Sequence, residues 1–324
     1  MKAIELRRVG ELKMGERPVP HPVAGEALLR VTHCALCRTD AKMLSRGHRD
    51  LVVPRVLGHE VCGTKEDGTR WAVWPGTACG ECRACREGLE NLCSSMRILG
   101  FHRDGGLAEW VAVPASSLLP LPPALPGPLA CMAEPLACAL NGLDRLALRE
   151  GENLLILGGG TLGWMLAVAA RARGAFPFVM ERSESKLRRA STLRDATGVP
   201  AGTHLPEERF HAAVNAAPGV ETLRAGVERL WPGGRFCLFS GLTGEEPVEP
   251  SFLNEIHYRQ LTVTGAYGCT RGQMGRALDL LTSHRAAFEG LLEERISLER
   301  VPERMEGVLS GELFKFVVEM ESGA

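Results

Sequence analysis

The sequence predicts an α/β protein with two domains, a mixed β domain followed by a doubly wound parallel sheet. Its 324 residues exceed what one hydrophobic core usually organises, so two cores are expected. Short apolar runs separated by turn residues occupy the first part of the chain. After a Pro/Leu-rich stretch at 118–129, runs of strand and helix type alternate instead. Such alternation is typical of a parallel sheet with helices on both faces.

Four apolar runs predict the strands of the first domain. Turn residues bound each run, as they do in the strands of a mixed sheet. Asp67-Gly68 lies between two of the runs and predicts a tight β-hairpin. The runs are ALLRVTHC (27–34), VVPRVLGHEVCG (52–63), TRWAVWPG (69–76) and LAEWVAVP (107–114).

Strands and helices are predicted in turn along the second domain. A helix over 163–174 should end at Gly174, and Pro177 is compatible with a strand because it lies near the start of its run. The expected strands are 153–157, 176–180, 211–217, 234–240 and 261–266, and the expected helices are 163–174, 184–193 and 219–230. The basic segment KLRRASTLR within this region is interpreted as a solvated helix face rather than a nucleic-acid contact.

Composition excludes several classes of partner. The net charge of −1 provides no overall field to attract nucleic acid or anionic lipid. The N-terminal residues lack the apolar core of a signal peptide, and consecutive glycines interrupt the apolar stretch 154–170, so neither export nor a membrane span is expected. Eleven cysteines in a cytoplasmic protein are expected to be thiols and metal ligands rather than disulfides.

Four cysteines in the segment CGECRACREGLENLC (79–93) predict a structural zinc site. Four thiolates around one tetrahedral ion leave no open position for a substrate, so this site should stabilise a lobe rather than carry out chemistry. An iron–sulfur motif of the bacterial type has a different final spacing, and disulfides conflict with the expected compartment. The ligands are Cys79, Cys82, Cys85 and Cys93.

The segment GGGTLG predicts a dinucleotide-binding turn of the Rossmann type. It follows the strand 153–157 and opens a helix, which is the required setting for G-x-G-x-x-G. Glu181 lies at the end of the next strand, where an acid can bind the ribose hydroxyls of NAD. Arg182 could instead attract the extra phosphate of NADP, so NAD is favoured without excluding NADP. The residues of the turn are Gly158, Gly160, Thr161, Leu162 and Gly163.

A reactive metal requires mixed ligands and a free position, and two short segments offer them. CALCRTD supplies Cys37, and VLGHE supplies His59 with Glu60 beside it. A single cysteine or histidine is more often a packed core residue than a ligand, so these segments have little weight when each is taken alone.

Together, the motifs resemble those of the zinc-dependent medium-chain dehydrogenase/reductase family, which contains the alcohol and polyol dehydrogenases. The resemblance extends over essentially the whole chain and rests on several independent motifs in the same order. It implies a GroES-like catalytic domain and a Rossmann cofactor domain. The matching segments are C-x-x-D at 37–40, GHE at 58–60, the four-cysteine segment, DGGLAEWVAVP at 104–114, AEPLACAL at 133–140 and the dinucleotide turn.

This resemblance implies a catalytic zinc site. Cys37 and His59 match the first two ligands, and Glu134 matches the acid that the polyol branch places at the metal, directly or through water. Glu60 matches a carboxylate that exchanges on and off the ion. Cys138 is a rival for Glu134, because the alcohol branch uses a cysteine. The alternatives are a capping or ion-paired Glu134 and a core Cys138.

The resemblance also implies a route for the proton released when an alcohol is oxidised. Thr39 matches the hydroxyl that passes this proton onward, although a threonine two residues after Cys37 could also be a helix N-cap. Arg38 matches an arginine of the alcohol branch that holds the cofactor pyrophosphate. Lys42 stands where relatives often have a histidine that completes a proton relay, so His48 or water would take over that role.

The expected protein is therefore a zinc-dependent oxidoreductase that transfers hydride between a secondary alcohol, polyol or sugar hydroxyl and NAD(P). Residues 1–141 with 271–324 should form the catalytic domain and 142–270 the cofactor domain, with one catalytic and one structural zinc per chain. The family implies a homodimer or homotetramer. Two alternatives are a zinc-independent reductase of the same superfamily and a non-catalytic nucleotide-binding or redox-sensing protein that keeps the structural zinc. Phe101, His102 and Trp110 are candidates for lining the substrate pocket.

Overall fold

The computed structural model describes residues 1–244 and 247–321, and the chain divides into two compact units. One unit contains residues 1–137 and 269–324, and the other contains residues 138–268. Residues 322–324, at the end of the expected catalytic segment, lie outside the described residues. The first unit is built on mixed sheets and the second on a parallel sheet, so the predicted α/β class is confirmed.

The first unit contains two larger sheets and a two-stranded ribbon. The three-stranded sheet has the order β2-β1-β4, the seven-stranded sheet has the order β10-β6-β5-β3-β18-β17 with β9 paired to β3, and β7 pairs with β8. These strands are β1 (Lys2–Arg8), β2 (Glu11–Glu16), β3 (Glu26–Ala35), β4 (Arg55–Val56), β5 (Glu60–Thr64), β6 (Arg70–Val73), β7 (Gly76–Thr77), β8 (Arg97–Ile98), β9 (Trp110–Pro114), β10 (Leu118–Pro120), β17 (Leu292–Ile296) and β18 (Lys315–Glu319).

Strand β3 brings distant parts of the chain together. At its end, Ala35 is paired with Glu60 of β5 on one side and with Val317 of β18 on the other. Residues directly opposite one another in antiparallel strands lie close together. The register therefore gathers the segment after β3, the start of β5 and the start of β18 at one place in the sheet.

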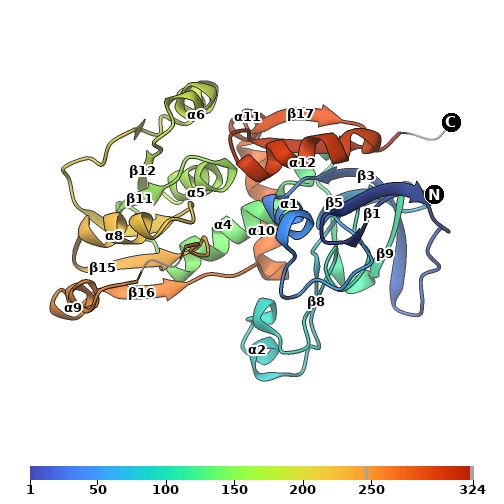
Figure 1. The fold of residues 1–324 in the computed structure, drawn as a ribbon, viewed down its shortest axis with the longest axis horizontal. Helices are drawn as coiled ribbons and strands as arrows, with labels where there is room; N and C mark the ends of the chain where they lie inside the picture. The colour runs from blue at the N-terminus through green and yellow to red at the C-terminus, as the bar shows by residue number, and fades with distance from the viewer. Residues whose placement is uncertain (245–246, 322–324) are drawn as a thin grey trace. The chain divides into compact units, whose positions relative to one another are not determined.

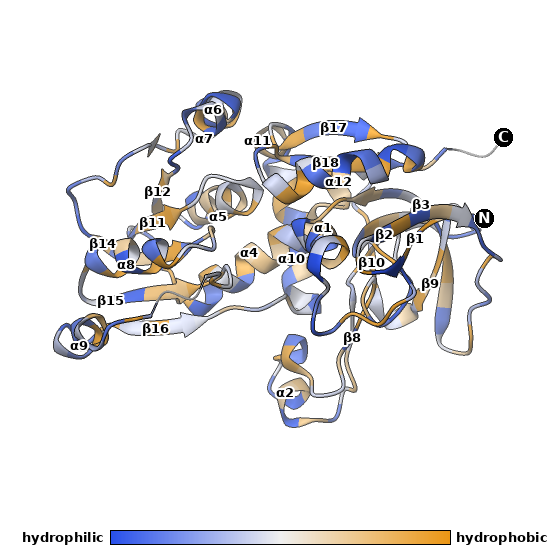
Figure 2. Ribbon diagram, in the orientation of Figure 1, coloured by the Kyte–Doolittle hydropathy of each residue, from blue (hydrophilic) through white to orange (hydrophobic). Residues whose placement is uncertain are grey.

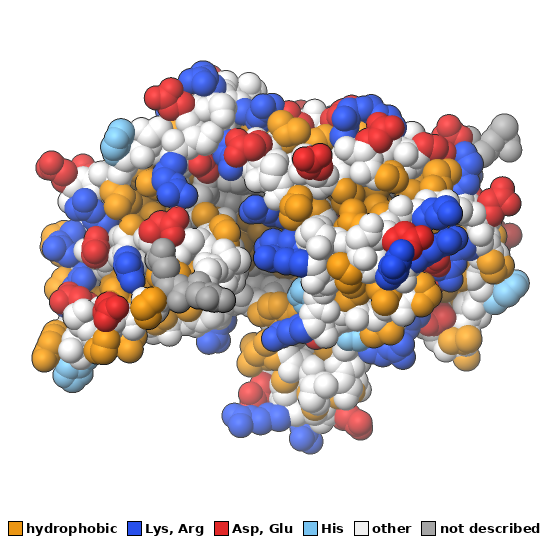
Figure 3. Space-filling view, in the orientation of Figure 1, with side chains coloured by type: hydrophobic (Ala, Val, Ile, Leu, Met, Phe, Trp, Pro, Cys, Tyr) orange, Lys and Arg blue, Asp and Glu red, His pale blue; other side chains and the backbone are white. Residues whose placement is uncertain are grey.

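Short helices complete the first unit. The helix α1 packs against α12, and a lobe around α2 projects from the rest of the unit (Figure 1). Charged side chains cover the outer end of this lobe (Figure 3). The elements are α1 (Arg38–Arg46), α2 (Arg83–Arg86), α3 (Gly127–Ala130), α10 (Arg271–Ser283), α11 (Arg285–Glu289), α12 (Val301–Ser310) and the 3₁₀ turns η1 (Glu90–Leu92), η2 (Ala115–Ser117) and η3 (Leu298–Arg300).

The second unit is a six-stranded parallel sheet with helices packed on it. Its order is β13-β12-β11-β14-β15-β16, with α5 packed on β11 and β12 and α8 packed on β14 and β15. Figure 2 shows hydrophobic colour along β11 and β12, as expected for a sheet covered by helices. The strands are β11 (Asn153–Leu157), β12 (Phe176–Met180), β13 (Ala201–Gly202), β14 (Phe210–Asn215), β15 (Leu230–Leu238) and β16 (Thr262–Gly265).

Six helices carry or follow these strands. The helix α4 begins in the first unit at Ala133 and its later turns belong to the second. None of the helices in the described part of the chain combines the length and apolar composition needed to cross a bilayer. The helices are α4 (Ala133–Arg145), α5 (Thr161–Ala172), α6 (Glu184–Arg189), α7 (Ser191–Thr197), α8 (Val220–Glu228) and α9 (Pro250–Tyr258).

Most expected elements are present, with two corrections. The Asp67-Gly68 hairpin joins β5 to β6, with Gly68 at φ +80°. The single helix expected over 184–193 is wrong, because the chain forms α6 and α7 with a break at Ala190. The helix α9 was not predicted, since it presents no buried residue and so lacks a continuous apolar face. Pro177 is tolerated because β13 pairs only with Val179 and Met180.

Candidate functional site

Cys37 is the N-cap of α1, so its position is determined by the start of a helix. Its backbone is extended (φ −97°, ψ 145°), and its Sγ accepts a hydrogen bond from the backbone N–H of Thr39 at 3.4 Å. The sulfur therefore lies at the positive end of the helix dipole. Because Cys37 is the cap, the alternative that Thr39 caps the helix is wrong, and Thr39 lies in the first turn with its hydroxyl free of that role.

Asp40 is buried and connects the two segments that carry Cys37 and His59. Its Oδ2 accepts from the backbone N–H of Cys37 at 3.0 Å, and its Oδ1 accepts from the N–H of Gly58 at 3.3 Å. Gly58 has φ +94°, and a side chain there would collide with Leu107 and Cys34. The Asp40 carboxylate therefore fixes the loop before β5 onto the first turn of α1.

His59 is buried with one ring nitrogen directed at this carboxylate. Nδ1 lies 3.4 Å from Asp40 Oδ1, within ion-pair distance but without the geometry of a hydrogen bond. Burial disfavours the imidazolium, but the Asp40 carboxylate and the Cys37 sulfur raise the pKa of His59 well above its usual value. An acid at Nδ1 is the usual support of a metal-ligating histidine, and it leaves Nε2 available.

Donor atoms of Cys37, His59 and Glu60 lie within 4.8 Å of one another. The Asp40 carboxylate and the Cys37 sulfur favour positive charge at His59, and a divalent cation would supply such a charge. One soft sulfur, one imidazole and one carboxylate suit zinc with an open position. The residues present therefore fit a catalytic zinc ion.

Glu60 is held by a lysine from the end of the chain. The ammonium of Lys315, in β18, lies 2.8 Å from both carboxylate oxygens and 3.2 Å from the carbonyl of Leu36. Both side chains are buried. Burial raises the pKa of Glu60, and the Lys315 ammonium opposes this effect. Here the ammonium engages both carboxylate oxygens, so it competes with a metal ion for Glu60.

Glu134 lies in the first turn of α4 and is buried. Its charge acts on both Glu60 and Lys315, so it belongs to the same neighbourhood, but it is not grouped with Cys37 and His59. A carboxylate oxygen of Glu134 lies within 4.8 Å of the Sγ of Cys269 instead. Cys138 follows Glu134 by one helical turn and so shares its face of α4.

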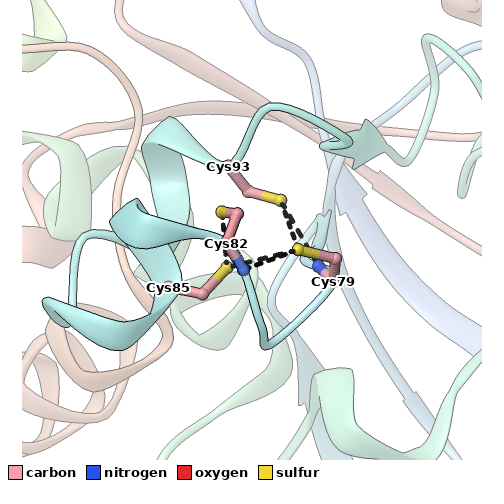
Figure 4. A group of neighbouring side chains, drawn as sticks. All are labelled: Cys79, Cys82, Cys85 and Cys93. Carbon is pink, nitrogen blue, oxygen red and sulfur yellow. Dashed lines mark hydrogen bonds between the residues drawn. The ribbon is translucent and has the colours of Figure 1, made fainter.

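The four lobe cysteines point toward one another (Figure 4). Their sulfur atoms are 3.5 Å apart for Cys93 and Cys79, 3.5 Å for Cys82 and Cys85, and 4.0 Å for Cys79 and Cys85. Four ligands at about 2.3 Å from a tetrahedral zinc are separated by about 3.8 Å, so this arrangement fits the ion. All eleven cysteines of the chain are free thiols, and these contacts are too long for disulfides.

Backbone N–H groups support the lobe sulfurs. The N–H of Cys82 donates to Cys79 Sγ at 3.3 Å, and the N–H groups of Cys79 and Ser95 donate to Cys93 Sγ at 3.3 and 3.4 Å. Backbone donors lower the pKa of Cys82 to about 6. Donors directed at sulfur stabilise thiolates, which is the form that binds metal. Gly80 and Gly88 provide the left-handed turns, with φ of +79° and +73°.

The predicted dinucleotide turn has the geometry that its glycines require. Gly158 has φ +120°, and a side chain at Gly163 would collide with the carbonyl of Gly158. At Gly160, the N-cap of α5, an added Cβ meets nothing within 4 Å. Thr161 and Leu162 form the first positions of α5. This open approach to a helix N-terminus suits a diphosphate.

Glu181 is oriented by two backbone groups at the end of β12. Its oxygens accept from the N–H of Gly159 and of Ser183, both at 2.9 Å. A fixed carboxylate beside the glycine turn can bind ribose hydroxyls and would repel a phosphate on the same ribose. The exposed side chain of Arg182 lies 3.3 Å from Glu221, so its charge is partly compensated.

The remaining predicted residues differ in how close they lie to the centre. Phe101 is buried and packs edge-on against the rings of His59 and His48, at centroid distances of 5.4 and 5.3 Å. The ring of His102 accepts from the backbone of Ile98, and Trp110 lies in β9. Among the three pocket candidates, only Phe101 contacts a proposed ligand through an aromatic pair in the described residues.

Sequence reasoning missed three residues at this centre. Asp40 was inside the C-x-x-D motif but received no role, although its spacing from Cys37 was the available signal. Lys315 and Cys269 lie in segments without a motif. The pairing of β18 with β3 positions Lys315 at the centre, and Cys269 lies directly before the N-cap of α10. No local pattern in the sequence could have identified these two.

Known proteins with similar sequences identify the family to which this chain belongs. The chain is 31% identical over 317 residues to D-altritol 5-dehydrogenase of Agrobacterium fabrum, a match that covers 93% of this chain and 94% of the relative. The chain belongs to the zinc-type medium-chain dehydrogenase/reductase family. Residues 23–123 of this dehydrogenase match the alcohol dehydrogenase GroES-like domain.

Two further relatives support the assignment. L-galactonate-5-dehydrogenase of Escherichia coli is 26% identical over 322 residues, covering 90% of this chain and 94% of the relative. A solved structure described as a zinc-binding dehydrogenase from Sinorhizobium meliloti 1021, bound to NADP, is 29% identical with a TM-score of 0.87 and covers 98% of both chains. This dehydrogenase is therefore a zinc-type oxidoreductase that acts on alcohols with a nicotinamide cofactor.

Proposed function

We propose that this dehydrogenase oxidises a secondary hydroxyl of a polyol or sugar acid with NAD, using a zinc ion held by Cys37, His59 and Glu134. The observation that carries the proposal is the convergence of the Cys37 thiol, the His59 imidazole and the Glu60 carboxylate within 4.8 Å of one another, with the charge of Glu134 acting on Glu60. The two curated relatives named above act on D-altritol and L-galactonate, which supports a polyhydroxylated substrate.

Glu134 is the proposed third group at the metal, directly or through water. The engagement of both Glu60 oxygens by Lys315 supports this choice over permanent ligation by Glu60. Glu60 then acts as a carboxylate that can exchange with the ion. Cys138, one turn after Glu134, and Cys269 are the rival thiols near that acid.

The zinc ion, when bound, lowers the pKa of an alcohol and polarises a carbonyl. The residues around it have distinct tasks. Asp40 orients His59 through Nδ1, and the α1 N-terminus orients Cys37. We assign to Thr39, two residues after Cys37, the role of receiving the hydroxyl proton of the substrate. Arg38 donates from Nε to the carbonyl of Leu309 at 2.9 Å, which leaves its terminal nitrogens to bind the diphosphate of the cofactor.

NAD is the proposed cofactor, with Gly158, Gly160, Thr161, Leu162 and Gly163 around its diphosphate. Two backbone donors hold the Glu181 carboxylate in place, so it cannot easily turn away from a second phosphate. The pairing of Arg182 with Glu221 further weakens the case for NADP. The NADP found with the Sinorhizobium relative is the contrary indication that a direct comparison of cofactors must address.

The proposal includes a structural zinc in the four-cysteine lobe, a cytoplasmic location and a homodimer or homotetramer. Free thiols at all eleven cysteines suit a reducing compartment. In the second unit, β16 forms an edge of the sheet and carries the exposed Val263, with exposed Leu253 and Tyr258 in the preceding α9. An exposed edge strand is suited to pairing with a second copy of the chain.

The proposal is tested with a panel of polyols, aldonic acids, amino alcohols and simple secondary alcohols, each assayed with NAD and NADP. Cys37→Ser is the decisive variant, because serine also caps helices and so preserves α1 while removing the thiolate. We expect turnover to fall by at least about 10³-fold, with an unchanged melting temperature. Cys237→Ala, which removes a thiol in β15, should retain activity. Full activity in Cys37→Ser would overturn the proposed metal centre.

A further inference from the structure

The D-G-G segment, Asp104 with the two glycines after it, has no task in the proposed function. Three donors nevertheless converge on the Asp104 carboxylate. Its Oδ1 accepts from the backbone N–H of Val56 at 3.1 Å and from Nη1 of Arg55 at 2.9 Å, and its Oδ2 lies 3.2 Å from Nη2 of Arg17. Val56 stands three positions before His59. Asp104 is therefore tied to the segment that leads into a proposed zinc ligand.

The backbone before His59 runs beside the D-G-G segment and is hydrogen-bonded to it. The N–H of Gly105 donates to the carbonyl of Val56 at 2.8 Å, and the N–H of Gly106 donates to the carbonyl of Gly58 at 2.9 Å. A side chain at Gly105 would collide with the carbonyl of Gly58, so glycine is required for this close approach. Displacement of the D-G-G segment would therefore displace the backbone that carries His59.

Gly58 is held at both of its backbone polar groups. Its N–H donates to Oδ1 of Asp40 at 3.3 Å, and its carbonyl accepts from the D-G-G segment. Asp40 belongs to the helix whose N-cap is Cys37, whereas Asp104 belongs to the turn between β8 and β9. The position of His59, the next residue, thus depends on two acids that come from different parts of the unit.

Two arginines fix the orientation of the Asp104 carboxylate. The side chain of Arg55 is 15% exposed, and its Nε donates to the carbonyl of Val52 at 3.0 Å. Arg17 also pairs with Glu5 of β1, the strand that binds β4. Guanidinium groups on both oxygens restrict rotation of a carboxylate. The direction of the Asp104 oxygens is therefore set by groups outside the metal centre.

We propose that Asp104 is a positioning residue of the metal centre, which holds the backbone before His59 so that the imidazole stays beside Cys37 before an ion binds. This inference rests on the proposed function and adds a residue to it. Asp40 orients the His59 ring through Nδ1, and Asp104 fixes the backbone to which that ring is attached. Ligands that are already in place bind an ion more tightly, because the ion does not have to order them.

Zinc affinity tests this role without turnover. The dissociation constant of the weaker of the two zinc ions is measured by competition with a metallochromic dye. Asp104→Ala removes all three contacts and should weaken binding of this ion by roughly tenfold. Asp104→Asn keeps an oxygen for the Val56 N–H, so its affinity should stay close to that of wild type. Asp104→Glu keeps the charge but displaces the oxygens by one methylene, so it should weaken binding nearly as much as Asp104→Ala.

Asp67→Ala is the matched control. Asp67 also orders a turn of the same unit, by accepting from the N–H of Thr69 at 2.9 Å, but this turn is the hairpin between β5 and β6. The control should keep the wild-type affinity, and the lobe should keep its zinc in every variant. Cobalt loaded into the weaker site gives a second readout, because its visible absorption reports the coordination geometry. This absorption should change in Asp104→Ala and in Asp104→Glu, and not in the control.

Two results would overturn the role of Asp104. One is wild-type zinc affinity with an unchanged cobalt spectrum in Asp104→Ala. The other is tight binding in Asp104→Glu with weak binding in Asp104→Asn, which would assign the effect to charge rather than position. If Asp104→Ala does not fold, the comparison of these last two variants decides. Uptake of a single zinc by wild type would overturn both proposals, whereas two zinc ions without oxidation of any alcohol in the panel would contradict the proposed function alone.

Discussion

At the scale of single residues, the most constrained pair in the centre is Glu60 with Lys315. Two opposite charges are buried at 2.8 Å, and the ammonium also binds the carbonyl of Leu36, next to Cys37. Removing either partner leaves a buried charge without compensation, whereas removing both charges does not. The pair therefore holds the Glu60 carboxylate and the start of the Cys37 segment in one arrangement.

Lys315→Met should lower the free energy of unfolding by about 3–5 kcal/mol, because Glu60 then lies buried and unpaired. The double variant Glu60→Gln/Lys315→Met should recover a large part of this loss. Urea denaturation of wild type, both single variants and the double variant measures the coupling. Additive effects of the two substitutions would show that the pair is not coupled.

Glu181 should control the choice of cofactor. Glu181→Gln keeps an acceptor for the Gly159 N–H but removes the charge that repels a second phosphate. We expect the ratio of kcat/KM for NAD to that for NADP to fall by about tenfold, which corresponds to about 1.4 kcal/mol. Glu221→Gln, which releases Arg182 and leaves Glu181 unchanged, should shift the ratio less. Equal shifts in the two variants would assign the choice to Arg182.

At the scale of elements, helix ends and turns position most of the chemistry. The first turn of α1 carries Cys37, Thr39 and the supporting Asp40, and the first turn of α5 forms the dinucleotide site. The cysteine lobe is also attached through a helix end. Glu90 in η1 accepts from the backbone N–H of Arg271 at 3.1 Å, in the first turn of α10. The Arg271 side chain in turn binds the carbonyls of Ser116 and Leu118.

Cys85→Ser should release the metal of the lobe without removing the catalytic centre. We expect the zinc content to fall by one ion per chain and the melting temperature to fall by roughly 5 °C, because metal binding contributes to folding of the lobe. The kcat below the transition should remain near that of wild type. Ser95→Ala is the control, since its backbone N–H still supports Cys93. Loss of kcat in folded Cys85→Ser would place this metal in the reaction.

Elements defined by local sequence were predicted well, and those that depend on distant contacts were not. The turn 158–163 and the hairpin at Asp67-Gly68 follow from glycine requirements that neighbouring residues reveal. The break between α6 and α7 has no glycine or proline to mark it. Lys315 is 255 residues from Glu60 in the sequence, and only the pairing of β18 with β3 makes them neighbours. The candidate ligands could therefore be named from local sequence, whereas the residues that support them could not.

At the scale of the whole molecule, two different sets of candidate metal ligands lie in one unit. The lobe offers four sulfurs, of which Cys79 is exposed. The other set offers a partly buried sulfur from Cys37 together with a buried imidazole and a buried carboxylate. Thiolate ligands hold zinc more tightly than oxygen ligands do. Zinc ions bound to these two sets should therefore differ in binding affinity, and their removal should affect different properties, activity for one and thermal stability for the other.

Elemental analysis should find two zinc ions per chain. Gradual chelation should remove activity first and thermal stability second, because the centre with oxygen ligands binds zinc less tightly than the four-sulfur lobe. Reloading with zinc or cobalt after the first stage should restore turnover. A single zinc per active chain would instead favour the zinc-independent reductase, and two zinc ions with bound cofactor and no turnover would favour a non-catalytic nucleotide-binding protein.

The place of β18 in the sheet also sets an order of events during synthesis. Ribosomes add about 5–20 residues per second, so roughly 13–50 s separate the appearance of Glu60 from that of Lys315, 255 positions later. In that interval the nascent chain carries Glu60 without its ammonium. The buried pair that orders the Glu60 carboxylate is thus among the last contacts of this unit that the growing chain can make.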